Sequence, residues 1–224
     1  MPYRKIPLVS QEIYHIFNRS IAKQPIFLDR RDYQRIIELI NFYRYQNLPL
    51  RFSHYKRLDT DKRQKLLAEI QKTLKPRVEI LAFCIMPNHI HLLLKAVADN
   101  AITKFMSDIQ NSYSKYFNLK YDRTGSLFQS MFKAVRIETD EQLIHVSRYI
   151  HLNPVTSYII NFNSLKDYSW SSFQLYLSGQ PDSLINTIPV MEHFKNKEDY
   201  RIFTENQVEY QRELDKIKHL VIDP

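Results

Sequence analysis

The chain has 224 residues, 44% of them hydrophobic, so it can bury a sizeable core as one domain or as one domain with an extension. Its two glycines, Gly125 and Gly179, argue against a glycine-rich nucleotide loop, and its single cysteine, Cys84, excludes a disulfide framework or a multi-cysteine zinc site and indicates a reducing compartment. The formal net charge of +8, with 15 tyrosines and 13 phenylalanines, favours a polyanion such as single-stranded nucleic acid, although a merely soluble basic protein has the same composition.

The first part of the chain predicts a strand, a helix and an insertion. Residues 12–20 are rich in aromatic and branched side chains and predict a strand. Asp29 is the expected N-cap of a helix that runs to about residue 45. Residues 47–75 predict a hairpin-like excursion and a second amphipathic helix. The opening residues do not have the apolar region of a signal peptide, and no run of about 18 apolar residues predicts a membrane span.

The middle of the chain predicts two strands, at residues 77–86 and 89–96, joined by the turn residues Pro87 and Asn88. Further predicted elements are a helix over 101–120, a loop over 121–131, a strand over 132–137 and a helix that starts at the capping box TDEQ (139–142). Pro154 is expected to end this helix, and further helices are expected in the last third of the chain.

The predicted order is therefore strand, helix, strand, strand, helix, strand. This is the order of the α+β, ferredoxin-like fold, in which a four-stranded antiparallel sheet carries two helices on one face. The open face of such a sheet is a common platform for nucleic acid. We expect residues 1–155 to form this core, with the helical insertion at 47–75, and residues 156–224 to form a C-terminal helical extension packed on it.

The stretch MPNHIHLLL (86–94) carries the chemistry. Alternation along a strand places His89 and His91 on one face, with their α-carbons roughly 6.5–7 Å apart, and turns Ile90 toward the helix layer. Two neutral imidazoles at this spacing can share one divalent cation, which would act as a Lewis acid on a phosphodiester. The alternative is that one histidine packs in the core and the other is exposed.

Tyr113 is a candidate nucleophile, because it lies on the helix that follows the histidine strand. Attack of its hydroxyl on a phosphodiester would give a phosphotyrosine link that conserves the energy of the broken bond. Tyr116 is an equally good candidate, and either residue also fits the role of a core aromatic. Asn118, one turn beyond Tyr113, can offer a carboxamide oxygen to the metal, and Glu138 is a further candidate ligand. The following basic and polar residues are candidate phosphate contacts or ordinary surface groups: Lys120, Arg123, Gln129, Lys133 and Arg136.

The chain also resembles a known family over about residues 12–178. Five motifs occur in the same order as in single-tyrosine HUH transposases, particularly the branch of REP-associated tyrosine transposases. They are YHIFNRSIAKQPIF (14–27), MPNHIHLLL (86–94), SYSKYFNLKYDRTGSLFQSMFKA (112–134), YIHLNPV (149–155) and YSWSSF (168–173).

The resemblance implies an enzyme that cuts single-stranded DNA, often beside a hairpin, forms a 5′-phosphotyrosine intermediate and then rejoins strands. It implies Mg²⁺ or Mn²⁺ and no nucleotide cofactor, and it aligns His89 and His91 with the metal pair and Tyr113 with the nucleophile. It also implies a bacterial, cytoplasmic, nucleoid-associated protein without a membrane partner, as a monomer or a homodimer.

Two departures from the family pattern occur. Ser130 and Met131 replace a Gly-Arg pair, and Phe117 stands where relatives have a third metal ligand, about four residues after the tyrosine. The alternative function is a domesticated protein that binds hairpin nucleic acid without cutting it. A histidine-triad nucleotide hydrolase is excluded because residue 93 is a leucine, and a zinc metalloprotease because no HExxH motif occurs.

Overall fold

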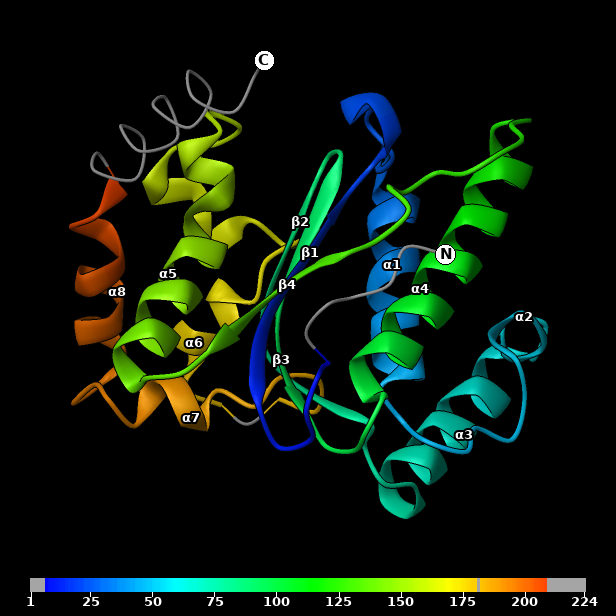
Figure 1. Ribbon diagram of the computed structural model, residues 1–224, viewed down its shortest axis with the longest axis horizontal. Coiled ribbons are helices and arrows are strands. Elements are labelled where there is room, and N and C mark those ends of the chain that lie inside the picture. Colours follow the sequence, from blue (N-terminus) through cyan, green and yellow to red (C-terminus); the bar gives the residue numbers. More distant parts are fainter. Residues whose placement is uncertain (1–6, 181, 209–224) are drawn as a thin grey trace.

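The computed structural model describes residues 7–180 and 182–208. Its centre is a four-stranded antiparallel sheet with the spatial order β2-β3-β1-β4 (Figure 1). The strands are β1 (Ile13–Arg19), β2 (Val78–Met86), β3 (His89–Ala96) and β4 (Lys133–Ile137). With helices in the two crossovers, this order confirms the predicted α+β, ferredoxin-like fold.

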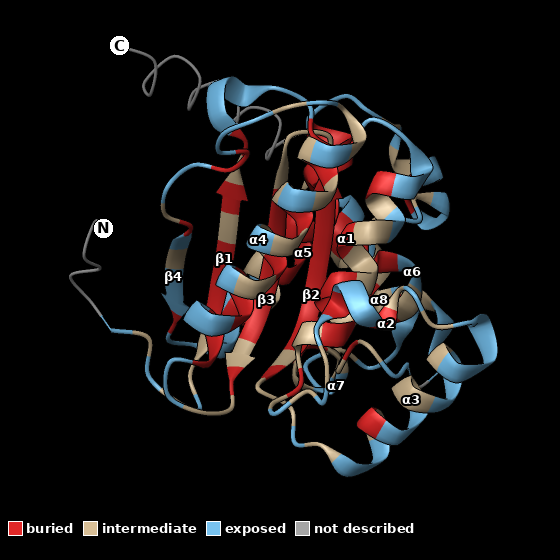
Figure 2. Cartoon of the chain, turned by 90° about the vertical axis from the view of Figure 1, so that its right-hand side faces the viewer, coloured by how far each residue is buried: buried red, intermediate tan, exposed pale blue. Residues whose placement is uncertain are grey.

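Helices cover both faces of the sheet. α1 (Arg30–Tyr43) and α4 (Ala101–Lys120) pack on one face, as predicted, and α5 (Asp140–Thr156) packs on the other (Figure 1). The expectation of an open second face is therefore wrong. β2 and β3 are consequently buried on both sides and read as nearly continuous apolar runs, whereas the edge strand β4 is largely exposed (Figure 2).

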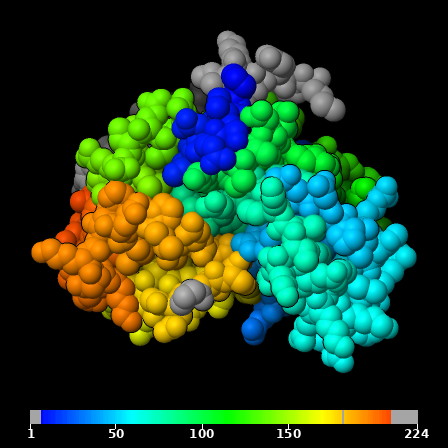
Figure 3. Space-filling view, turned by 90° about the horizontal axis from the view of Figure 1, so that it is seen from below, coloured from blue at the N-terminus to red at the C-terminus, as the bar shows by residue number. Residues whose placement is uncertain are grey.

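The insertion consists of two helices, α2 (Phe52–Tyr55) and α3 (Thr60–Thr73), which form one side of the surface seen in Figure 3. Its helical character is confirmed, but the hairpin-like excursion is wrong. Phe52 and Tyr55 are three residues apart and both pack on Phe42 of α1, with ring centroids 5.3 and 5.0 Å from it. Burying two rings on one side favours a helical turn over an extended strand.

α5 continues through Pro154 and ends at Thr156, so the expected stop at Pro154 is wrong. A proline leaves the carbonyl four residues earlier without its helical donor. Here that carbonyl belongs to Ile150, and the Asn153 side-chain amide donates to it at 3.5 Å and to the Tyr149 carbonyl at 2.8 Å. A side chain thus replaces the missing backbone donor, which permits the last turn.

Beyond α5, the chain forms short helices beside it, on the same side of the sheet (Figure 1). They are η2 (Phe162–Asp167), α6 (Phe173–Ser178), α7 (Ile188–Met191) and α8 (Lys197–Glu205). Residues 1–6 of the expected core, and 181 and 209–224 of the expected extension, lie outside the described residues. The division of the chain at residue 155 stays a prediction. Within the described ranges, no helix combines the length and apolar character that crossing a membrane requires.

Candidate functional site

Three histidines gather on the sheet face that α5 covers. His89 and His91 of β3 lie on one side of the strand, and their ring centroids are 5.0 Å apart. His15 of the neighbouring strand β1 joins them, with its Nε2 2.9 Å from Nδ1 of His91 and the two rings stacked. The predicted pair is therefore part of a three-ring cluster, and His15 is a member that the sequence reasoning missed.

The hydrogen bonds orient the two predicted ligands. Nδ1 of His89 lies 2.6 Å from the side-chain oxygen of Asn88, which can only accept, so Nδ1 carries the proton and Nε2 carries the lone pair. Burial and the charge of Arg19 lower the pKa of His89 to about 3, so its ring is neutral at neutral pH. A neutral imidazole held by a hydrogen bond at its other nitrogen is the form that binds metals.

Tyr149 of α5 faces this cluster. Its ring centroid lies 5.7 Å from that of His91 and 5.8 Å from that of His15, in edge-on geometry. Asn153 is one turn further along α5 and therefore lies on the same side of the helix. Its amide group donates to the carbonyls of Tyr149 and Ile150, which leaves the carboxamide oxygen as the atom that can bind a cation.

Tyr113 lies on the opposite side of the sheet, in α4. It is fully buried, its hydroxyl donates to the Ile26 carbonyl at 2.5 Å, and its ring packs on Phe27 and Phe128. Burial raises the pKa of this hydroxyl far above its usual value. The expected meeting of Tyr113 with the histidines is therefore wrong. Since Ile90 points to the helix layer that holds α4, the histidines point away from it.

Tyr116 and Lys120 belong to a network that joins α4 to the start of α1. The fully buried Asp32 accepts from the Tyr116 hydroxyl at 2.9 Å, from the Tyr121 hydroxyl at 2.8 Å and from Lys120 Nζ at 2.7 Å. Burial raises the pKa of Asp32, but the bonds from Lys120 and its neighbours outweigh it and hold the pKa below its usual range. Tyr116 therefore does not reach the histidines. Lys120 is paired with Asp32 in this network, and its contact with a phosphate stays a prediction.

Asn118 also lies away from the histidines, at the end of α4. Its amide donates to the Gly125 carbonyl at 2.8 Å and so ties down the loop after the helix. The expected metal ligand is therefore a loop anchor. The nearby Phe117 is buried in the helix layer, and the Arg123 guanidinium lies over its ring, 5.7 Å from the centroid.

The remaining predicted phosphate contacts lie along β4 and the segment before it. Lys133 is exposed and stands opposite Phe17, on the face that carries the histidines. Gln129 is exposed, and its backbone bonds to Arg19, the residue opposite His89. Arg136 points to the other face and pairs with Glu12 at 2.8 Å. Lys133 and Gln129 thus border the histidine cluster, whereas Arg123 and Arg136 do not.

Glu138 follows β4 and is exposed, with its backbone N–H bonded to the Gln142 side chain at 2.8 Å. It contributes a cap to α5. Within residues 7–180 and 182–208, no three His, Cys, Asp or Glu side chains are grouped as a metal site.

His151, in the same motif as Tyr149, has a structural role. Its two ring nitrogens lie 2.7 Å from the Tyr200 hydroxyl of α8 and 2.8 Å from the Ser172 hydroxyl, and burial lowers the pKa of the ring to about 3. α5 therefore presents Tyr149 to the sheet and is attached through His151 to the residues that follow it.

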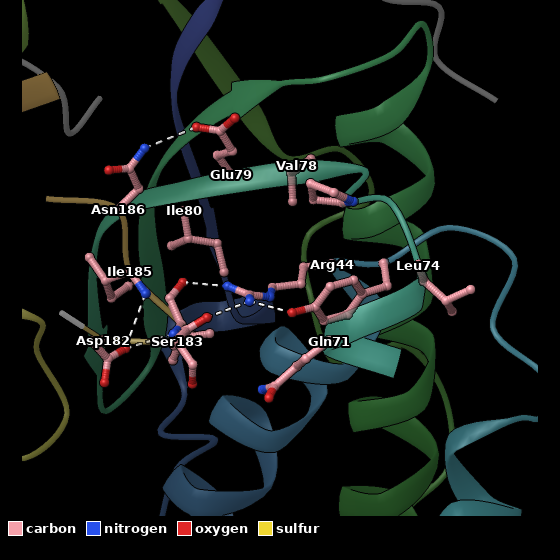
Figure 4. Close-up of a pocket in the computed structure, with 13 residues that line it drawn as sticks. Arg44, Gln71, Leu74, Val78, Glu79, Ile80, Asp182, Ser183, Ile185 and Asn186 are labelled. Carbon is pink, nitrogen blue, oxygen red and sulfur yellow. Dashed lines mark hydrogen bonds between the residues drawn. The ribbon is translucent and has the colours of Figure 1, made fainter. Parts of the chain in front are cut away.

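A cavity of about 300 Å³ lies elsewhere, between the end of α1, the start of β2 and residues 182–186 (Figure 4). Arg44 donates across it to the carbonyls of Leu184, at 2.7 Å, and Ser183, and to the Tyr45 hydroxyl. None of the histidines lines it. Arg44, Asp182 and Asn186 each bond to another residue of the lining, and the bonds of Arg44 and Asn186 join distant parts of the chain.

The signal for Tyr149 was present in the sequence. Ile90 and the two histidines point to opposite faces, so the helix that meets the histidines has to be one that covers the second face. The helix predicted from the capping box at 139–142 lies outside the two crossovers and contains YIHLNPV, where Tyr149 and Asn153 are four residues apart.

The chain is similar to known proteins in part of its sequence and in its fold. Residues 50–153 match the family model described as "Transposase IS200 like". A solved structure of a REP-associated tyrosine transposase bound to a REP hairpin is 15% identical, with a TM-score of 0.53, and the match covers 83% of this chain and 91% of that one. A putative transposase from Deinococcus radiodurans R1 is 13% identical, with a TM-score of 0.35, over 66% of this chain and 95% of that one. The curated proteins contain no match to this sequence.

Proposed function

Because residues 50–153 match the model of the IS200-like transposase family, we propose that the chain is a member of this family and that it cuts and rejoins single-stranded DNA with Tyr149 as the nucleophile. The hydroxyl oxygen of Tyr149 attacks the phosphorus of a phosphodiester, and the bond from phosphorus to the 3′-oxygen breaks. The tyrosine proton passes to a base, and the leaving 3′-oxygen becomes a hydroxyl. The 5′-phosphotyrosine that results is released when a 3′-hydroxyl of another strand attacks it.

The observation that carries this proposal is the contact of the Tyr149 ring with His91, with centroids 5.7 Å apart. It brings a hydroxyl-bearing side chain to the two imidazoles, which no geometry of Tyr113 or Tyr116 provides. A fold shared with a protein whose structure contains a REP hairpin supports hairpin DNA as the partner. Lys133 and Gln129, which border the histidine cluster, are the predicted phosphate contacts that this placement favours.

The donor set fits a divalent cation. His89 and His91 supply imidazole nitrogens, and the carboxamide oxygen of Asn153 supplies a hard ligand of the type that suits Mg²⁺ or Mn²⁺. When bound, the cation supplies Lewis-acid polarisation of the scissile phosphate. This assignment also places the third ligand four residues after the tyrosine, the spacing that the family resemblance implies and that Phe117 cannot satisfy.

The test is a denaturing gel of the protein with a labelled single-stranded oligonucleotide that contains a hairpin, in the presence of Mn²⁺. The wild type and Tyr113→Phe should form a denaturation-resistant adduct, and Tyr149→Phe should form none while still binding DNA. An adduct that persists in Tyr149→Phe refutes the assignment. A wild type that binds the hairpin but never forms an adduct identifies the alternative function, a hairpin-binding protein without cleavage.

A further inference from the structure

A groove of about 1080 Å³ runs between the insertion and α4, on the side of the sheet away from the histidines. Figure 1 shows α2 and α3 beside α4, with α5 across the sheet. Its walls come from α4, from the end of α1 and from the segment 47–53 that opens the insertion. The proposed cleavage chemistry uses none of these residues.

The groove is strongly basic. One acidic side chain, Asp108, lines it, against six basic ones: Arg35, Arg51, Lys56, Arg77, Lys104 and Lys115. Asp108 pairs with Arg77 at 2.9 Å and with Lys104 at 2.6 Å. Arg51 and Lys115 are exposed, and in the described part of the chain neither has an acidic partner. Lys56 pairs with Glu38 at 2.9 Å. The remaining positive charge, that of Arg35, Arg51 and Lys115, has no carboxylate partner in the described part of the chain and suits a polyanion.

The α4 wall of the groove is long enough for several nucleotides. Lys104 and Lys115 lie on the same stripe of α4 and are about 16 Å apart along the helix axis. Even at the spacing of a strand within a duplex, about 3.4 Å per phosphate, this length accommodates no more than roughly five phosphates. Asn111 and Ser112, which can donate hydrogen bonds to phosphate oxygens, line the groove between them.

Apolar and aromatic groups complete the lining. Tyr116 and Phe52 line the groove, and the Arg35 guanidinium lies 4.6 Å from the Tyr116 ring centroid. Leu119, at the end of the same stripe, is 87% exposed. Sites for single-stranded nucleic acid combine a basic groove with such surfaces, on which unpaired bases pack. A duplex, whose bases are stacked on one another, would leave these surfaces without a partner.

We propose that this groove binds single-stranded DNA as a second contact, separate from the site of cleavage. The inference rests on the proposed function in one respect, since it takes the strand to be continuous with the one that is cut. The groove contributes to affinity and takes no part in the chemistry. Arg51 and Lys115 contact phosphates, and the exposed Leu119 and the partly exposed Tyr116 contact bases.

The test measures binding of a fluorescent oligothymidylate by anisotropy over a range of salt concentrations, in the Tyr149→Phe background. The groove variant carries Arg51→Glu and Lys115→Glu. Its matched control carries Lys65→Glu and Lys72→Glu, two exposed residues of α3 that do not line the groove and give the same change in charge. Circular dichroism verifies that both variants are folded.

The groove variant should bind about tenfold more weakly than the control, and the slope of log K against log salt should fall by about 1.4, the value for two lost contacts to a single strand. At saturating DNA, adduct formation by the groove variant with Tyr149 intact should equal that of the wild type. Equal affinities and slopes for groove variant and control overturn the inference, as does weakened binding of duplex alone. Groove-dependent binding without any adduct in the wild type would instead contradict the proposed function and leave the groove assignment standing.

Discussion

His15 and His91 share a hydrogen bond of 2.9 Å between Nε2 of the first ring and Nδ1 of the second, across neighbouring strands. When His91 donates this proton, its own Nε2 keeps the lone pair that a metal requires. In this tautomer His15 is a positioning residue that accepts the hydrogen bond and sets the ring angle of His91. Partners of this kind commonly change metal affinity by 10–100-fold.

Replacement of His15 should weaken Mn²⁺ binding. We expect His15→Ala to raise the dissociation constant for Mn²⁺ about tenfold or more, measured by isothermal titration calorimetry. His54→Ala, which removes an exposed histidine from α2, is the control and should leave the constant unchanged. An unchanged constant in His15→Ala would remove the positioning role.

Two substitutions of Asn153 should differ in their effect on Mn²⁺ affinity and agree in their effect on stability. Asn153→Asp keeps an oxygen for the cation and adds charge, so Mn²⁺ affinity should rise or hold, whereas Asn153→Ala should lower it. Both variants lose the amide donor to the carbonyls of Tyr149 and Ile150, so each should lower the free energy of unfolding by about 1 kcal/mol, measured in urea. Affinity that falls equally in the two variants would exclude the carboxamide oxygen as a ligand.

Tyr113→Phe should affect stability and not the adduct. The change leaves the buried Ile26 carbonyl without its donor, which should lower the free energy of unfolding by about 1–2 kcal/mol. Urea titration gives the change, and the oligonucleotide gel gives the adduct. A folded Tyr113→Phe protein that forms no adduct would restore Tyr113 as a candidate.

Asp32→Asn should destabilise the protein in a pH-dependent way. At neutral pH, the loss of charge-assisted bonds from Lys120 and Tyr121 should lower the free energy of unfolding by about 2 kcal/mol. Because the fold lowers the pKa of Asp32, its contribution is complete above the unfolded carboxyl pKa of about 3.9 and disappears as pH falls through the lower folded pKa.

The difference between wild type and Asp32→Asn should therefore be constant from neutral pH to about pH 5 and should narrow as the pH approaches 3. Thermal unfolding at a series of pH values measures it. Asp61→Asn, an exposed residue of the α3 first turn, is the control. A difference that widens on acidification would contradict the sign of the Asp32 pKa shift.

The sheet and the long helices follow from local periodicity. Three elements, β2, β3 and α4, begin and end within one residue of their predicted bounds. Alternation, turn residues and the apolar stripe set those bounds. The strand order then follows from the sequence of elements, because few topologies connect these elements without crossing. The short helix α2 could not be predicted from local periodicity, because its helical turn depends on a contact with Phe42, which lies ten residues before Phe52.

In the candidate site, too, the local features could be predicted from the sequence and the contacts between distant segments could not. The shared face of His89 and His91 is a local property of a strand and could be predicted. The partner of that face depends on which helix covers it, and α4 and α5 carry similar apolar stripes with tyrosines. Choosing Tyr113 required α4 to lie on the histidine side, which the orientation of Ile90 already contradicts. His15 could not be predicted, because its contact depends on the register of β1 against β3.

The bonds of His151 have a genetic consequence. α5 holds Tyr149 against the histidines. His151, also in α5, bonds through its ring nitrogen Nδ1 to the hydroxyl of Tyr200 in α8. A nonsense or frameshift mutation between codons 153 and 200 leaves every histidine and tyrosine of the proposed cleavage site encoded, yet removes the Tyr200 hydroxyl to which the fully buried His151 imidazole is bonded. The presence of the histidine and tyrosine codons therefore does not suffice to identify a gene copy that encodes a folded protein. The reading frame also has to extend through α8.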